Sequence, residues 1–139
     1  MLHNSKTRVM VFGTFDVLHK GHWNFFKQAR KLSKKAFLIV SVARDVNVKK
    51  IKSRKPINSE KIRLKNVFSS KLVNKALLGG LKNHITHITQ QKPDIIALGY
   101  DQKAYTKNLK RDLTKKGLNV KIKRLKAFKP NIYKSSKII

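Results

Sequence analysis

Two histidines three positions apart stand where a helix is expected to begin. His19 and His22 close the segment 13–22, GTFDVLHKGH, which directly follows a short apolar run. A helix start offers free backbone N–H groups to an anion, and Gly21 allows close approach to the backbone. Imidazole N–H donors placed there can hold phosphate oxygens and stabilise charge on a transferring phosphoryl group. The alternative is a pair of polar loop histidines, against which the preceding GTFD argues.

A second candidate group is the basic run 49–57, KKIKSRKPI, followed by Glu60 and Arg63. A flexible cationic loop over an anionic pocket can close on phosphates and exclude water. The alternative is a solvated lysine-rich loop, which a chain with 34 Lys and Arg residues would produce without any function. These residues are therefore candidates for contacts with the phosphates of a substrate.

Two further segments carry groups that suit a nucleotide. Gly99, after an apolar run, allows a base or ribose to lie against the backbone, and Asp101 offers a carboxylate to ribose hydroxyls. An ordinary turn with Asp as a helix cap is the alternative. Near the end of the chain, Ser135 and Ser136 offer hydroxyl and N–H donors to a phosphate, unless they form a frayed tail.

Metal and thiol chemistry find little support in the sequence. The chain has no cysteine, which excludes disulfides, a thiolate nucleophile and cysteine-based metal sites. His84 and His87 are spaced three apart on a predicted helix but lack a carboxylate partner, so a surface face is expected there. We predict no protein-built metal site.

The charge and the hydropathy bound the class of protein. The formal net charge is +28, from 34 Lys and Arg against 6 Asp and Glu, a field that would draw any polyanion. A basic nucleic-acid-binding module is therefore an alternative to an enzyme. No apolar run approaches the ~20 residues of a membrane span, and the first run is too short for a signal peptide. We expect a cytoplasmic protein without membrane contact.

Short apolar runs alternate with segments of helical spacing along the chain. Strands are expected at residues 9–12, 36–43, 73–78, 94–98 and, as an edge strand, 120–125. Helices are expected at 21–33, from Ser59 onward, at 81–90 and at 107–116, with Ile62, Val67 and Phe68 facing inward on the second. Residues 44–58 are predicted to form a loop that ends near Pro56. Trp23 and Phe26 are predicted to pack in the core.

This order predicts an α/β fold: a Rossmann-like, parallel five-stranded sheet with helices on both faces, in a single domain spanning 1–139. In such sheets ligands bind beyond the carboxyl ends of the strands, near the switch point. The residues that follow Phe12, Ala43 and Leu98 should therefore lie together and carry the chemistry.

The segment 13–22 resembles the signature of the cytidylyltransferase-like branch of the HxGH nucleotidyltransferase superfamily, and the resemblance extends from Val9 to Ile139. Members transfer AMP or CMP to a phosphate-bearing acceptor and release pyrophosphate. The resemblance implies that His19 and His22 bind the triphosphate and stabilise the transition state at the α-phosphorus. It implies nucleotide contacts from Gly13, and from Thr14 and Phe15 through backbone groups.

The same resemblance implies roles for the other segments. Lys52 and Arg54 would contact the β- and γ-phosphates or the acceptor phosphate, and Arg63 would bind phosphate from its helix. Asp16 would help to hold the acceptor or a metal ion. Gly99 and Asp101 match the Gly-x-Asp of the nucleotide pocket.

The tail matches the family's Ile-Ser-Ser-Thr-x-Ile-Arg motif at Ser135 and Ser136 and departs from it elsewhere. Lys134 replaces the first Ile, Lys137 the Thr and Ile139 the Arg. A triphosphate contact from that Arg is missing, and Lys137 is a candidate substitute.

Within the superfamily, the loop KKIKSRKPI, the turn LGYDQ and the tail SSKII resemble archaeal-type FAD synthases, which transfer AMP from ATP to FMN. The rivals are glycerol-3-phosphate cytidylyltransferases, whose typical tail and Gly-Asp-Asp-Trp turn are absent, and the adenylylating domains of ADP-heptose synthesis. Mg²⁺ or another divalent cation is expected with the nucleoside triphosphate, and homodimers are common among members. Four aromatic residues are candidate walls for the flavin ring: Phe15, Trp23, Tyr100 and Tyr105.

Overall fold

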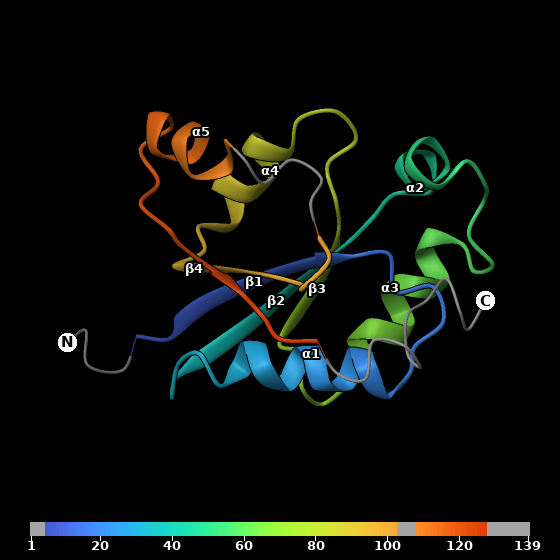
Figure 1. The fold of residues 1–139 in the computed structure, drawn as a ribbon, viewed down its shortest axis with the longest axis horizontal. Helices are drawn as coiled ribbons and strands as arrows, with labels where there is room; N and C mark the ends of the chain where they lie inside the picture. The colour runs from blue at the N-terminus through green and yellow to red at the C-terminus, as the bar shows by residue number, and fades with distance from the viewer. Residues whose placement is uncertain (1–4, 103–107, 128–139) are drawn as a thin grey trace.

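Five parallel strands form the centre of the computed structural model, which describes residues 5–102 and 108–127 (Figure 1). They lie in the order β3-β2-β1-β4-β5, so the chain reverses direction across the sheet at β1. Their bounds are β1 Thr7–Gly13, β2 Ala36–Val42, β3 Lys75–Leu78, β4 Ile95–Leu98 and β5 Lys121–Arg124. The predicted five-stranded parallel sheet with β5 at an edge is confirmed.

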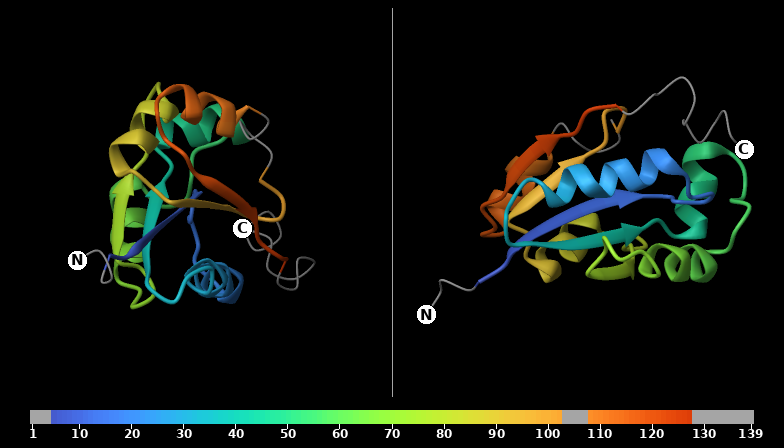
Figure 2. Two further views of the ribbon diagram at one scale, coloured as in Figure 1. Left: turned by 90° about the vertical axis from the view of Figure 1, so that its left-hand side faces the viewer. Right: turned by 90° about the horizontal axis from the view of Figure 1, so that it is seen from below.

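Helices cover both faces of the sheet, as expected (Figure 2). Alternate residues of β1 point to opposite faces: Val9 and Val11 pack with α1 (Lys20–Arg30) and α3 (Glu60–Phe68). Met10 packs on the other face with α4 (His84–Gln91) and α5 (Leu109–Lys115). Within the ranges that the structure describes, no helix has the length and apolar character needed to cross a bilayer.

The segment expected as a loop, 44–58, contains an eight-residue helix, α2 (Asp45–Lys52). Its N-cap residue, Arg44, provides no side-chain acceptor for the first turn. The carboxylate of Glu60, on α3, accepts the Asp45 N–H instead, at 2.8 Å. The prediction was wrong because the capping group comes from another helix and is invisible to local spacing.

The helix predicted from Ser59 exists, with the Ser59 hydroxyl accepting the Ile62 N–H as its cap, but its inward face differs. Val67 is buried as expected, whereas Ile62 is 49% and Phe68 60% exposed. The fully buried side chain in this part of the helix is Arg63, at 0% exposure. Polar partners, described below, make that burial possible.

The two histidines of α4 have different environments. His84 is exposed, as predicted, but His87 is buried, and its Nε2 lies 2.8 Å from the Ser41 hydroxyl of β2. The surface prediction was therefore wrong for His87. Burial, with the nearby charges of His84 and Arg44, lowers the pKa of His87. Trp23 and Phe26 do pack in the core, as predicted.

Candidate active site

The site lies at the edge of the sheet to which the strand arrows point (Figure 2, right). The beginning of α1, helix α2 and the segment 53–59 gather at this edge, beyond the ends of β1 and β2. The turn after β4 closes it from the other side, because the Gln102 side-chain amide donates to the Phe12 carbonyl at 2.8 Å. The switch point of the sheet thus brings the predicted segments together.

His19 and His22 are held in fixed tautomers by the start of α1. The Nδ1 of His19 accepts the Gly21 N–H at 3.1 Å, and the Nδ1 of His22 accepts the His19 N–H at 3.3 Å. A neutral imidazole that accepts at Nδ1 carries its proton at Nε2. The rings lie side by side, with centroids 4.0 Å apart. The pair therefore supplies two Nε2–H donors.

Both imidazoles are neutral at physiological pH. Burial lowers the pKa of His19. Burial, together with the charges of His19 and Lys52, lowers the pKa of His22 to about 3. The first turn of α1 contains no acidic residue, so the positive end of its helix dipole remains suited to an anion. The N–H groups of Gly21, His22 and Trp23 already donate to His19, so the imidazoles rather than these N–H groups are the donors offered here.

The loop between β1 and α1 adopts a strained conformation at Phe15. Its φ is 54°, a left-handed conformation that non-glycine residues rarely adopt. The Phe15 ring is buried and packs directly over Gly13, where a Cβ would lie 2.6 Å from the Phe15 Cζ. Gly13 is therefore required for packing of the loop, and Phe15 belongs to the core rather than to an open wall.

Asp16 anchors the segment 53–59 to this loop. Its two carboxylate oxygens accept the backbone N–H groups of Ile57 and Asn58, both at 2.7 Å, and its carbonyl accepts the Asn58 side-chain amide. The side chain is 8% exposed. The structure thus gives Asp16 protein donors, in contrast to the expected contact with an acceptor or a metal ion.

Arg63 is likewise directed at protein groups. Its guanidinium donates to the carbonyls of Thr14 and Asn58, at 2.8 and 3.0 Å, and to the Asp45 carboxylate at 2.6 Å. The expectation that Arg63 binds a phosphate differs from this arrangement. In the structure Arg63 joins the first loop, α2 and the segment 53–59.

Lys52 and Arg54 provide the exposed cations of the site. Lys52 is the last residue of α2, and its charge acts on His22. Arg54 follows in the exposed part of the segment 53–59. Cations in the last turn of α2 are favourable because they oppose the negative end of the helix dipole. These side chains remain candidates for contacts with anionic oxygens.

Gly99 and Asp101 lie in the turn after β4. The Gly99 N–H donates to the Gln102 side-chain oxygen at 2.7 Å, and its carbonyl accepts from Arg124 at 2.8 Å. Asp101 is exposed. Sequence reasoning gave no role to Gln102 and Arg124, because the bond of Gln102 to Phe12 and the bonds of Arg124 to the turn after β4 join residues that are distant in the sequence. Ser135, Ser136 and Tyr105 lie outside the described residues, while Trp23 packs against the core and Tyr100 is 36% exposed.

Known proteins resemble this chain over most of its length. The model of the cytidylyltransferase-like family matches residues 10–139. The FAD synthase of Methanosarcina mazei is 47% identical over 119 residues, covering 86% of this chain and 76% of its own. The FAD synthase of Thermococcus sibiricus is 41% identical over 142 residues, covering 100% of this chain and 94% of its own.

A solved structure supports the fold independently. The crystal structure described as a lipopolysaccharide core biosynthesis protein from Thermoplasma volcanium superposes with a TM-score of 0.81 at 38% identity. The match covers 88% of this chain and 98% of that one. The arrangement of sheet and helices therefore recurs in a relative that matches 88% of this chain.

Proposed function

The chain belongs to the cytidylyltransferase-like family, and we propose that it transfers the AMP part of ATP to FMN, forming FAD and releasing pyrophosphate. The observation that carries this proposal is the pair of Nε2–H imidazoles at the start of α1, in a chain 41–47% identical to archaeal FAD synthases. The enzyme is a nucleotidyltransferase.

The proposed reaction is a direct displacement at the α-phosphorus. A phosphate oxygen of FMN forms a bond to this phosphorus, and the bond to the oxygen that bridges to the β-phosphate breaks. The FMN phosphate is already an anion at neutral pH, so no general base is required. Catalysis then consists of positioning and neutralisation of charge. His19 and His22 donate Nε2–H groups to the triphosphate, where charge accumulates in the transition state.

Other residues have supporting roles in this proposal. Backbone groups of Gly13, Thr14 and Phe15 border the nucleotide, and Asp101 faces the ribose beside Gly99. Lys52 and Arg54 contact the β- and γ-phosphates or the phosphate of FMN. For Ser135 and Ser136 we retain the expected triphosphate contact as a proposal.

A divalent cation enters as part of the nucleotide substrate. Asp16, Asp45 and Glu60 each accept hydrogen bonds from protein donors, so they are poorly suited to bind Mg²⁺ as well. We propose that Mg²⁺ is coordinated by triphosphate oxygens and water. A chelator in excess should abolish product formation and added Mg²⁺ restore it, whereas full activity in the chelator would contradict a requirement for the cation.

The test of the proposed function is identification of the product. The chain is incubated with FMN and each of the common nucleoside triphosphates in separate tubes, and the products are identified by mass spectrometry. We expect FAD and pyrophosphate from ATP. Absence of any flavin dinucleotide with all of the triphosphates would overturn the proposal.

A further inference from the structure

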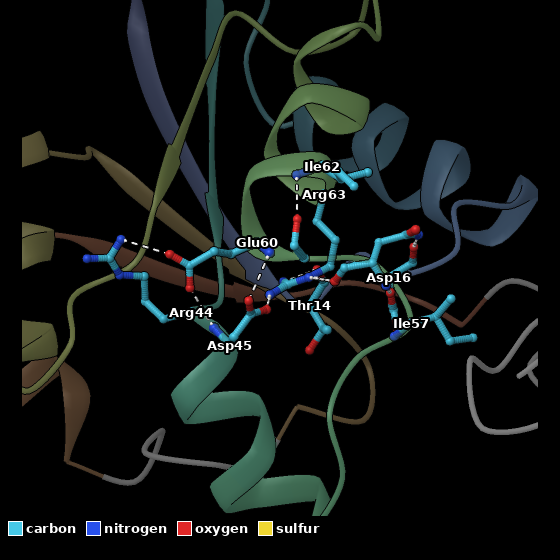
Figure 3. A network of polar contacts seen from close by, with 10 residues as sticks. Thr14, Asp16, Arg44, Asp45, Ile57, Glu60, Ile62 and Arg63 are labelled. Atoms are coloured by element: carbon cyan, nitrogen blue, oxygen red, sulfur yellow. Dashed lines mark hydrogen bonds and ion pairs between the residues drawn. The ribbon is translucent and has the colours of Figure 1, made fainter.

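Three of the chain's 6 acidic residues meet at one junction. Asp16 lies in the loop between β1 and α1, Asp45 begins α2 and Glu60 begins α3, and the buried Arg63 lies among them (Figure 3). We call these four residues the acidic junction. The chain carries 34 basic residues, so few of them can pair with a carboxylate. Half of the chain's carboxylates lie in this one junction.

Within the acidic junction, α2 and α3 cap each other. The Asp45 N–H donates to Glu60 Oε1 at 2.8 Å, and the Glu60 N–H donates to Asp45 Oδ2 at 3.2 Å. The second oxygen of each carboxylate accepts from an arginine: Arg63 at 2.6 Å for Asp45, and Arg44 at 3.3 Å for Glu60. All four carboxylate oxygens therefore have a donor, and the two helices are fixed to each other.

Arg63 extends this connection to the loop that precedes the imidazoles. Its bond to the Thr14 carbonyl and the bonds of Asp16 to residues 57 and 58 lie on either side of Phe15. Phe15 is the residue with the left-handed backbone. Such strain persists only where the surroundings over-determine it, and it concentrates at functional sites.

Helix α2 needs these external restraints. It has eight residues, fewer than the ~12 at which isolated helices become even marginally stable. Its last turn carries Lys49, Lys50 and Lys52, and the charge of Lys52 reaches His22. A displacement of α2 would therefore move cations relative to the imidazoles.

We propose that Asp45 and Glu60 are positioning residues of the transfer reaction. Asp45 acts through Arg63, and Glu60 acts through Arg44 and the Asp45 N–H. Together they hold α2, α3 and the loop 13–22 in one arrangement, and so set where the cations of α2 stand relative to His19 and His22. This inference rests on the proposed function. In this proposal Arg63 is an internal member of the acidic junction. It acts on the substrate only through the groups that it orients.

The test uses near-isosteric amides. In Asp45→Asn and Glu60→Gln, one oxygen becomes an NH₂ group that must face an existing donor, because both oxygens of each carboxylate accept in the wild type. Asp112→Asn, on α5, is the matched control, since it makes the same change of charge away from the acidic junction. Thermal unfolding is recorded for each, and assays are run well below every midpoint.

We expect each junction variant to lower kcat by about tenfold or more at saturating substrates, because misplacement of ~1 Å can cost up to ~100-fold. Asp112→Asn should keep wild-type kcat. In a Lys52→Ala background, Asp45→Asn should cost much less than it does alone, because the two residues act through the same helix. If Asp45→Asn fails to fold, Glu60→Gln, which leaves the Arg63–Asp45 ion pair intact, decides the question.

Two results would overturn the inference. The first is a lowered unfolding midpoint with kcat equal to that of Asp112→Asn, which would make the junction merely structural. The second is a cost of Asp45→Asn that is unchanged in the Lys52→Ala background. Failure of the wild type to form FAD would instead overturn the proposed function. The positioning role is then judged by the affinity for ATP, measured by calorimetry without FMN. We expect this affinity to weaken in Asp45→Asn and Glu60→Gln and to stay unchanged in Asp112→Asn.

Discussion

At the scale of single residues, the imidazoles of the site are prepared as hydrogen-bond donors before any substrate arrives. Backbone N–H groups occupy both Nδ1 atoms, and burial keeps the rings neutral. The two Nε2–H groups therefore need no change of tautomer to meet an anion. Donors fixed in this way cost little reorganisation when charge develops on the α-phosphoryl group.

Replacing either histidine should therefore affect the chemical step. We expect His19→Ala and His22→Ala each to lower kcat by about a hundredfold or more, as for the loss of an oxyanion-type donor. His84→Ala, on the exposed part of α4, is the control and should be close to wild type. Near-normal turnover in both variants would remove the imidazoles from the mechanism.

The half-buried His22 and the buried His87 also predict how stability depends on pH. The pKa of His22 is lowered to about 3 and that of His87 is lowered as well, so below pH ~6.5 the unfolded chain binds protons that the folded chain does not. Stability should therefore fall with decreasing pH, by up to about 1.4 kcal/mol per pH unit for each such proton.

Denaturant unfolding at pH 7, 6 and 5 measures this dependence. The free energy of unfolding should depend less steeply on pH in His22→Asn and in His87→Asn. Each substitution removes one group that binds a proton in the unfolded chain but not in the folded one. A stability that is independent of pH in this range, or a slope that neither substitution changes, would contradict the assignment of His22 and His87 as neutral.

At the scale of elements, local pattern was enough to predict the sheet and most of its helices. Short apolar runs marked β1, β2 and β4, and helical spacing marked α1 and α4. Helix α2 was missed because Glu60, the acceptor at its start, lies in another helix. Ile62 is exposed and Arg63 is buried, the reverse of what local spacing predicts, for a similar reason. Arg63 donates a hydrogen bond to the carbonyl of Thr14, which lies 49 residues earlier.

The candidate site shows the same division between local and distant information. His19 and His22 were found because the motif itself contains both the rings and the backbone groups that orient them. The nearest partner of Asp16 is 41 residues away and that of His87 is 46 residues away, so no local pattern indicates their hydrogen bonds. The one available signal was scarcity: a carboxylate is unusual in so basic a chain.

The anchor at Asp16 can be tested on its own element. In Asp16→Asn, one backbone N–H of the pair at residues 57 and 58 loses its acceptor, at a cost of about 1–3 kcal/mol for a buried group. Amide hydrogen exchange should become faster at these two positions. Asp94→Asn, where the carboxylate accepts the Arg8 N–H, is the control and should leave them protected. Unchanged protection in Asp16→Asn would contradict the anchor.

At the scale of the whole molecule, the net charge of +28 is incidental to the reaction in this account. We expect non-specific binding to duplex DNA at low salt that weakens steeply as salt rises, because such binding depends on release of counterions. Fluorescence anisotropy with two unrelated DNA sequences measures it. Tight binding to one sequence at physiological salt would instead support a nucleic-acid-binding module.

Competition in a single tube distinguishes transfer of AMP to FMN from the rival reaction. The chain is supplied with Mg²⁺, equal concentrations of ATP and CTP, and both FMN and glycerol 3-phosphate, and all products are quantified by mass spectrometry. We expect FAD as the main product, with pyrophosphate in equal amount. CDP-glycerol as the main product would contradict transfer of AMP to FMN, while leaving the fold and the paired imidazoles as described.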